Sequence, residues 1–146
     1  MTTNDKSKHL TVSLNLINNK LNFVGTTGSN DPISIDYTPP LGDNLGYTSL
    51  ELFLLSFSSC VGSAVLVLLR KMGKTISGFE ISASGIRKEQ HPTCFSIITL
   101  DMILKSSNTV DAEFEKVIGL ADEKLCPVWA MVKGNVEVTI NPTIIK

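Results

Sequence analysis

Apolar and polar side chains alternate along residues 10–16, with leucine or valine at every second position. This period of two is typical of a half-buried β-strand. Two further short apolar runs, residues 21–24 and 33–37, are separated by a stretch rich in glycine, threonine and asparagine that indicates a turn. The first third of the chain therefore predicts an antiparallel β-meander of three strands.

The longest apolar stretch follows and predicts a helix over residues 49–72. Thr48 and Glu51 have the spacing of a capping box, in which the hydroxyl and the carboxylate accept hydrogen bonds from amides at a helix start. Gly73 is expected to end the helix. None of residues 52–69 is charged, so the helix lacks a polar face and should be buried on every side.

A helix of this length and composition also matches a membrane span. Four serines interrupt the apolar run, and the alternating strands before it supply no second spanning helix, so we expect no membrane insertion. A helix of roughly 36 Å is hard to cover completely within so short a chain. We therefore expect a homodimer in which a second copy covers one side of the helix.

The remaining segments predict a hairpin and a second helix. Residues 76–88 and 95–104 indicate two long antiparallel strands joined by a loop that contains proline. Residues 110–124 fit an amphipathic helix. Its expected apolar stripe consists of Phe114, Val117, Ile118, Ala121 and Leu125.

The last part of the chain predicts a short helix and a strand. Pro127 is expected at the first helical position, which proline favours, so Cys126 should be the N-cap residue. Residues 136–140 alternate again and predict a final strand. Together with the earlier elements, this order predicts an α+β fold.

Composition limits the size and the partners of the protein. The length of 146 residues fits one domain over residues 1–146, with the polar residues 1–8 as a flexible N-terminus. Hydrophobic residues make up 42% and charged residues only 18%, which agrees with surface buried in an oligomer. With 13 basic and 14 acidic side chains and no basic cluster, we expect no nucleic-acid binding.

The cysteines and histidines suggest a reducing compartment and no metal. The three cysteines have unrelated spacings, unlike the disulfide framework of a secreted domain. The polar N-terminal residues lack the apolar core of a signal peptide, so we expect a cytoplasmic protein. His9 and His91 are far apart and no cysteines have CxxC spacing, so neither a metal site nor a cofactor is expected.

Two cysteine motifs carry a family resemblance. Residues 50–60 begin with Leu-Glu-Leu and end with Ser-Cys, and residues 123–128 read Glu-Lys-Leu-Cys-Pro-Val. In this order, with the same elements between them, they resemble the motifs of the OsmC/Ohr family, named for osmotically inducible protein C and organic hydroperoxide resistance protein. Residues 87–92 also resemble the central hairpin of that family, and the likeness extends over residues 10–140.

The resemblance implies an intertwined homodimer that reduces organic hydroperoxides. Cys60 matches the cysteine that attacks the peroxide, and Cys126 matches the cysteine that resolves the product. The chemistry is self-consistent, because a thiolate oxidised to sulfenic acid condenses with a second thiol to a disulfide. An external dithiol reductant must then reopen the disulfide by exchange, and no cofactor is needed.

The activation of Cys60 is the unusual feature of this sequence. A helix N-terminus should favour the thiolate of Cys126, whereas the apolar neighbours of Cys60 favour its neutral thiol, so Cys60 needs a nearby cation. Family members with peroxidase activity use an N-terminal arginine, but no arginine precedes Arg70. Arg87 is the first alternative candidate and Lys20 the second.

Glu51 and Cys94 complete the candidate residues. The family tends to place a carboxylate ten residues before the helix cysteine, where this chain has Leu50. Glu51 is on the opposite side of the helix from Cys60, so it can orient a cation or cap the helix but cannot touch Cys60. Cys94 matches no family position and is expected to be an ordinary free thiol.

A second function from another class fits the same fold. A dimer without peroxidase activity would bind a small hydrophobic molecule in an apolar pocket or act as a redox sensor. The missing arginine favours this alternative, whereas the presence of both motif cysteines favours the peroxidase.

Overall fold

A computed structural model describes residues 8–146; the flexible segment expected at residues 1–8 therefore lies almost entirely outside the described residues. The chain forms two compact units, Met1–Leu52 and Phe53–Lys146, here called the N-terminal unit and the C-terminal unit. Each is described by itself. The single domain expected from the length stays a prediction.

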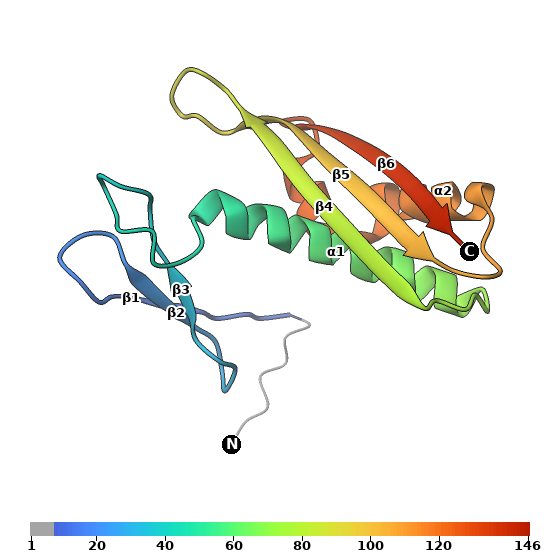
Figure 1. The fold of residues 1–146 in the computed structure, drawn as a ribbon, viewed down its shortest axis with the longest axis horizontal. Helices are drawn as coiled ribbons and strands as arrows, with labels where there is room; N and C mark the ends of the chain where they lie inside the picture. The colour runs from blue at the N-terminus through green and yellow to red at the C-terminus, as the bar shows by residue number, and fades with distance from the viewer. Residues whose placement is uncertain (1–7) are drawn as a thin grey trace. The chain divides into compact units, whose positions relative to one another are not determined.

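The N-terminal unit contains the predicted antiparallel meander. Its strands are β1 (Ser13–Leu16), β2 (Phe23–Thr26) and β3 (Ile33–Ile35), in that order in the sheet (Figure 1). The expectation of a half-buried first strand is wrong within one chain, because all four residues of β1 are exposed. Across residues 8–48 these strands are the only regular elements described, so the sheet has no second layer there that could cover either face.

Helix α1 (Ser49–Lys71) begins and ends as expected. Glu51 N donates to Thr48 Oγ1 over 3.2 Å, and Thr48 N donates to Glu51 Oε1 over 2.9 Å, which completes the capping box. Gly73 has φ of 75°, the left-handed conformation typical of a helix C-terminus. Burial on every side is not found within one chain, because Leu55 and Val67 remain about half exposed.

A three-stranded sheet forms one layer of the C-terminal unit. Strands β4 (Gly78–Arg87) and β5 (Phe95–Lys105) make the predicted antiparallel hairpin, with a register shift between Ile86 and Arg87. Strand β6 (Glu137–Ile145) pairs with β5 in parallel (Figure 1). It runs five residues beyond the predicted end at residue 140 and contains Pro142, which an edge strand tolerates because it pairs on one side only.

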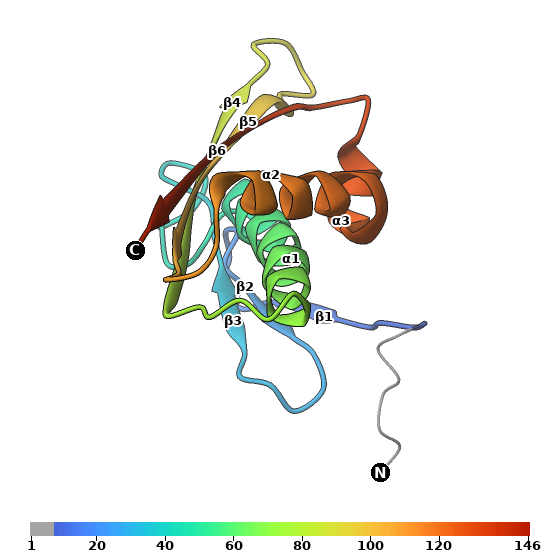
Figure 2. The ribbon, with the colours of Figure 1, turned by 90° about the vertical axis from the view of Figure 1, so that its right-hand side faces the viewer.

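Helices cover one face of this sheet, as Figure 2 shows for α1, α2 (Asp111–Leu120) and α3 (Pro127–Val132). Between α2 and α3 the chain makes a π-helical turn, η1 (Ala121–Leu125). The core lies between the helices and the sheet. Its fully buried apolar side chains are Phe57, Val61, Val65, Leu69, Ile98, Leu100, Met102, Leu104, Phe114, Val117 and Ala121. This arrangement is the predicted α+β fold.

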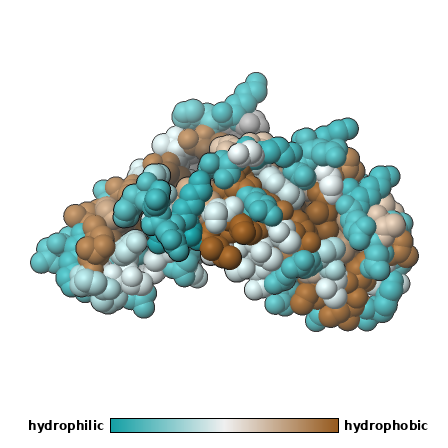
Figure 3. Space-filling model, turned by 90° about the horizontal axis from the view of Figure 1, so that it is seen from above, coloured by the Kyte–Doolittle hydropathy of each residue, from teal (hydrophilic) through white to brown (hydrophobic). Residues whose placement is uncertain are grey.

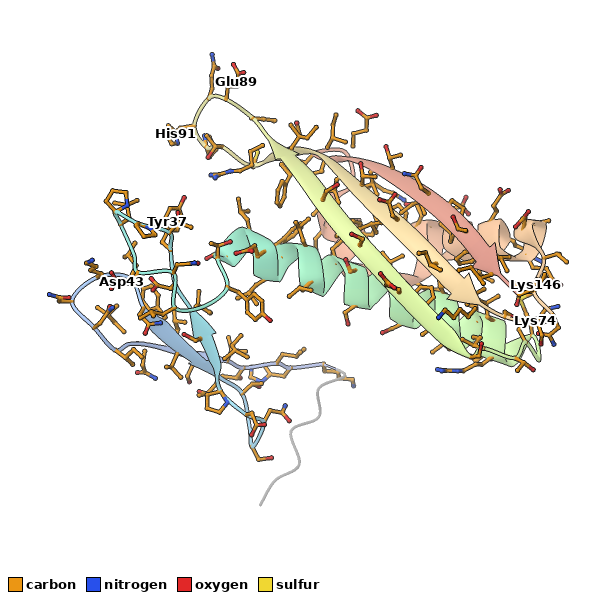
Figure 4. All side chains as sticks on the ribbon, viewed as in Figure 1. Tyr37, Asp43, Lys74, Glu89, His91 and Lys146 are labelled. Atoms are coloured by element: carbon orange, nitrogen blue, oxygen red, sulfur yellow. The ribbon has the colours of Figure 1, made fainter. Side chains whose placement is uncertain are left out.

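The two ends of the β4–β5 hairpin differ in character. Glu89 and His91 lie at the exposed tip of its loop, and Lys74 and Lys146 lie at the opposite end of the sheet (Figure 4). Lys74 Nζ is 2.7 Å from Glu113 Oε1 and donates to Asn108 O, whereas Lys146 Nζ donates to Thr109 O. These bonds tie the segment after α1 and the C-terminal residue to the loop before α2.

Helix α1 is long and apolar enough to cross a membrane by length and composition alone. Its stripe of buried residues, including Phe57, Val61 and Leu69, packs in the core of the C-terminal unit. The core helix of a soluble α+β protein has the same properties, so the helix is weak support for a membrane location.

Candidate thiol site

Cys60 is placed by the middle of α1. The buried stripe of the helix includes Phe57 and Val61, whereas Cys60 beside it is half-buried. The sulfur therefore lies at the border between the core and the exposed side of the helix.

Cys126 is placed by the π-helical turn before it. Cys126 N donates to Ala121 O over 2.9 Å, a hydrogen bond that spans five residues instead of four. The sequence predicted an ordinary helix through residue 124 with Leu125 on its apolar stripe. That prediction is wrong at the C-terminal end, because the wider turn rotates Leu125 off the stripe and leaves it 47% exposed. Cys126 is turned inward instead and is 3% exposed.

A salt bridge ties this turn to the far end of α3. Lys133 Nζ donates to Asp122 O over 3.2 Å and lies 2.8 Å from Asp122 Oδ1. The second contact is an ion pair and not one of the hydrogen bonds among the described residues. Lys133 thus joins the segments on both sides of Cys126.

Cys126 is the N-cap residue of α3, as the proline at position 127 indicated. Its Sγ accepts a hydrogen bond from Trp129 N over 3.4 Å. Trp129 is a functional neighbour that the sequence analysis missed. The capping rule could have found it, because an N-cap side chain bonds to the amide two or three residues further on.

The fold brings Cys60 and Cys126 together. Cys126 Sγ lies 2.8 Å from Cys60 Sγ, at hydrogen-bonding distance, and both thiols are free. A disulfide bond requires about 2.0 Å between sulfurs, so a small movement would suffice to form one.

Aromatic residues stand close to both cysteines in the chain, and their rings contact one another. The Phe57 and Trp129 rings meet edge to face, with centroids 5.6 Å apart, and Phe53 lies 6.4 Å from Phe57 and 6.1 Å from Phe95. The Phe95 ring lies across Gly85, where any added Cβ would be 2.4 Å from the ring. The segments that carry the two thiols are therefore rich in aromatic contacts.

The pKa of Cys126 is raised to about 11, first by burial and then by the interaction with the neighbouring Cys60 thiol. The amides of Trp129 and Val128 act in the opposite direction but are outweighed. The amides at the helix N-terminus favour the Cys126 thiolate as expected, but the net shift has the opposite sign because burial outweighs them. Helix α3 has only six residues and a small dipole, and burial penalises the charged sulfur more strongly.

The charged candidates have other partners. Arg87 donates from Nε to Thr93 O over 2.7 Å and from a terminal nitrogen to Thr93 Oγ1. In the N-terminal unit, Lys20 Nζ lies 2.7 Å from Asp43 Oδ1, and Glu51 caps α1 through Thr48. The hydrogen bonds with Thr48 hold the pKa of Glu51 below its ordinary value.

No cation or carboxylate is bonded to either thiol of the pair within residues 53–146. In the same described part of the chain, Cys94 is half-buried at the end of the hairpin loop and its thiol has no hydrogen bond. Across residues 8–146, no group of three or more histidine, cysteine or acidic side chains is arranged to hold a metal ion.

A groove runs between α1 and β4 in the C-terminal unit. It has a volume of about 330 Å³ and is more apolar than polar. Gly62 allows the close approach, since a Cβ there would be 3.0 Å from the Phe79 ring. The groove is lined by Leu55, Ser58, Ser59, Gly62, Ser63, Leu66, Phe79 and Ile81.

Comparison with known proteins yields one family and several similar folds. The family model described as "OsmC-like protein" matches residues 42–141. The protein YhfA of Escherichia coli (strain K12) is 27% identical over 119 residues, which cover 82% of this chain and 87% of YhfA.

Solved structures share the α+β fold. A hypothetical protein from Aquifex aeolicus VF5 has a TM-score of 0.83 and 27% identity, with 94% of this chain and 97% of that chain covered. An organic hydroperoxide resistance protein OsmC from Legionella pneumophila has a TM-score of 0.68 and 14% identity, with 92% and 96% covered. At 14% identity the second likeness shows the fold alone.

Proposed function

Because the chain belongs to the OsmC-like protein family, we propose that it reduces organic hydroperoxides through a Cys60/Cys126 thiol cycle. The membership confirms the resemblance drawn from the two cysteine motifs and supports a redox or peroxide-related role. The observation that carries the proposal is the 2.8 Å separation of two sulfurs that are distant in the sequence.

The cycle balances with the two cysteines and one external reductant. The Cys60 thiolate attacks the distal peroxide oxygen, the O–O bond breaks, and the alkoxide leaves and takes a proton to become an alcohol. The Cys60 sulfenic acid then condenses with the Cys126 thiol, which forms the S–S bond and releases water. A dithiol reductant reduces this disulfide by exchange and is itself oxidised.

The aromatic residues near the two cysteines support an organic hydroperoxide as the substrate. The rings of Phe53, Phe57 and Trp129 offer apolar contact to an alkyl or aryl group. We propose Arg87 as the cation and Glu51 as the carboxylate that would assist Cys60. Arg87 bonds to Thr93 and Glu51 to Thr48, so neither is bonded to Cys60. To assist Cys60, each would have to change partners or come from the second copy of a dimer.

Homodimerisation and a cytoplasmic location complete the proposal. The apolar side chains exposed on β1 and on α1 supply surface for a second copy, and hydrophobic surface is visible on both units (Figure 3). All three cysteines are free, which suits a reducing compartment.

Stopped-flow mixing of the reduced protein with cumene hydroperoxide tests the proposal. We expect rapid loss of two thiols and a Cys60–Cys126 disulfide on peptide mapping. Cys60→Ser should abolish peroxide consumption, and Cys126→Ser should stop after one turnover with a sulfenic acid that oxidises further. Cys94→Ser is the matched control and should behave as the parent. A disulfide that includes Cys94, or none, would contradict the assigned pair.

The groove between α1 and β4 favours a second candidate, binding of a small hydrophobic molecule without peroxidase activity. A fluorescent apolar probe such as anilinonaphthalene sulfonate should then bind the reduced protein. Ser59→Trp should reduce that binding by filling the groove from an exposed position. Probe binding together with unreactive thiols would favour this candidate over the peroxidase.

A further inference from the structure

The two thiols of the site form a directed chain of hydrogen bonds. Trp129 N donates to Cys126 Sγ over 3.4 Å, and the Cys126 thiol donates to Cys60 Sγ over 2.8 Å. Cys126 is 3% exposed, whereas Cys60 is half-buried. The buried sulfur is therefore the donor and the more accessible sulfur is the acceptor.

Within residues 53–146, the contact with Cys126 is the one hydrogen bond of the Cys60 sulfur. The lysines and the arginine of this part of the chain whose bonds are described have other partners: Arg87 bonds to Thr93, Lys133 to Asp122, and Lys74 to Glu113. A hydrogen bond becomes shorter and roughly twice as strong when its acceptor is ionised. A thiol donor in an apolar site can thus contribute what a cation contributes elsewhere.

We propose that Cys126 has a second task before it resolves the sulfenic acid: its S–H group is the hydrogen-bond donor that stabilises the Cys60 thiolate. The inference deepens the proposed function, on which its catalytic meaning rests. In this scheme Cys60 loses its proton to solvent, and Cys126 keeps its own until the disulfide forms and water leaves.

Cys126 is suited to keep its proton. Burial, followed by the interaction with Cys60, raises the pKa of Cys126 to about 11. Cys60 is the only titratable group within the described residues that contributes to this shift, and the opposing contributions come from two backbone amides. At neutral pH Cys126 therefore keeps its proton and stays available as the donor.

The surrounding turn holds the donor in place. The five-residue hydrogen bond from Cys126 N to Ala121 O fixes the backbone of Cys126, and the contacts of Lys133 with Asp122 link the turn to α3. Trp129 N also donates to the Cys126 sulfur. The backbone and the sulfur of Cys126 are therefore both restrained while its thiol donates to Cys60.

Replacing the donor tests the inference without any peroxide. In a Cys94→Ser background, the rate of Cys60 alkylation by iodoacetamide is measured against pH for Cys126→Ala and Cys126→Ser. Alanine removes the donor, so the midpoint should rise by about one pH unit or more relative to the parent, a loss of about tenfold in thiolate at neutral pH. Serine keeps an O–H donor and should recover most of that loss.

Two outcomes of the alkylation experiment would contradict a donor role of Cys126. Equal midpoints in the parent and in Cys126→Ala, or equal shifts in Cys126→Ala and Cys126→Ser, would overturn the inference. If either variant fails to fold, the reciprocal measurement applies: the ultraviolet absorbance of the Cys126 thiolate should appear at lower pH in Cys60→Ala than in the parent. An unchanged Cys126 midpoint there would also overturn it.

The two proposals fail in different experiments. Alkylation reports the Cys60 thiolate alone, so the donor role can hold in a protein that does not react with cumene hydroperoxide. Conversely, fast peroxide reduction with no response of alkylation to Cys126→Ala would leave the proposed function intact and remove the donor role.

Discussion

In the C-terminal unit, β5 buries alternate apolar side chains, among them Ile98, Leu100 and Met102, beneath a layer of helices. In the N-terminal unit, β1 has the same alternation, but Leu14 and Leu16 remain more than half exposed. The difference lies in the second layer and not in the strands. Alternation determines which side chains share a face, and only a covering element determines whether that face is buried.

The buried residues of the two units also differ in kind. Within residues 8–52 they are Asn22, Asp36 and Gly42, whereas residues 53–146 contain every buried apolar side chain of the described chain. Asn22 Nδ2 donates to Ser34 Oγ and to Ile35 O. The N-terminal unit is therefore organised by polar contacts, and the C-terminal unit by a hydrophobic core.

The largest expected effect is in the C-terminal core. Leu100→Ala removes a fully buried side chain and should lower the free energy of unfolding by about 2 to 5 kcal/mol. Denaturant unfolding followed by the fluorescence of Trp129, the sole tryptophan, measures this unit directly. Ile86→Ala is the matched control, 64% exposed on the neighbouring strand, and should change stability by about 0.5 kcal/mol or less. Similar losses in both variants would contradict the contrast.

The next effect concerns the exposed leucine side chains of β1, Leu14 and Leu16. If a second copy covers it, Leu14→Ser should weaken dimerisation by about 2 kcal/mol, roughly a thirtyfold rise in the dissociation constant. Sedimentation equilibrium measures that constant. Asn15→Ser, on the alternate face of the same strand, is the control and should leave it nearly unchanged. A monomeric parent protein at micromolar concentration would remove the basis for this prediction.

A smaller effect is expected where α1 begins. Thr48→Ala removes the hydroxyl that accepts from Glu51 N and should destabilise the helix start by about 1 kcal/mol. Amide hydrogen exchange at the first turn of α1 should quicken, with little change in the β4–β6 sheet. Thr48→Ser retains the hydroxyl and should behave as the parent. Faster exchange in both variants would mean that the threonine methyl group, rather than the cap, is responsible.

The sequence predicted the order and type of most elements because their signals are local. The capping box at Thr48, the glycine stop at Gly73 and the alternation in β4 and β5 each depend on neighbours within a few residues. The N-cap position of Cys126 followed from Pro127 in the same way. The approach of Cys60 to Cys126 was expected from the family resemblance and not from any local pattern.

The features that the sequence could not predict depend on distant contacts. The π-helical turn before Cys126 has no motif in the sequence, yet it moves Leu125 to the surface and Cys126 into the core. That burial reversed the expected direction of the Cys126 pKa shift. The partners of Arg87 and Lys20 likewise depend on loop conformations that periodicity does not describe.

The smallest expected effect tests the polar organisation of the N-terminal unit through pH. Asp36 is 3% exposed and its carboxylate accepts hydrogen bonds from Tyr37 N, Asp43 N and Leu45 N; Tyr37 and Asp43 mark this loop in Figure 4. Burial raises the pKa of Asp36, but these three amides, assisted by Lys20, outweigh it and hold the pKa below its ordinary value.

The sign of the pH effect follows from that lowered pKa. The stabilisation by Asp36 is fully present above the ordinary aspartate pKa of about 3.9 and is lost as pH falls through the lower folded value. As the solution is acidified below about pH 4, amide exchange at positions 37, 43 and 45 should quicken, after correction for the intrinsic rate, before any change in Trp129 fluorescence. Asp36→Asn should show the faster exchange already at neutral pH, because it lacks the charge, whereas Asp31→Asn, an exposed control, should not. Simultaneous loss of both signals in the parent would mean that the two units unfold together and that the polar contacts of the N-terminal unit have no stability of their own.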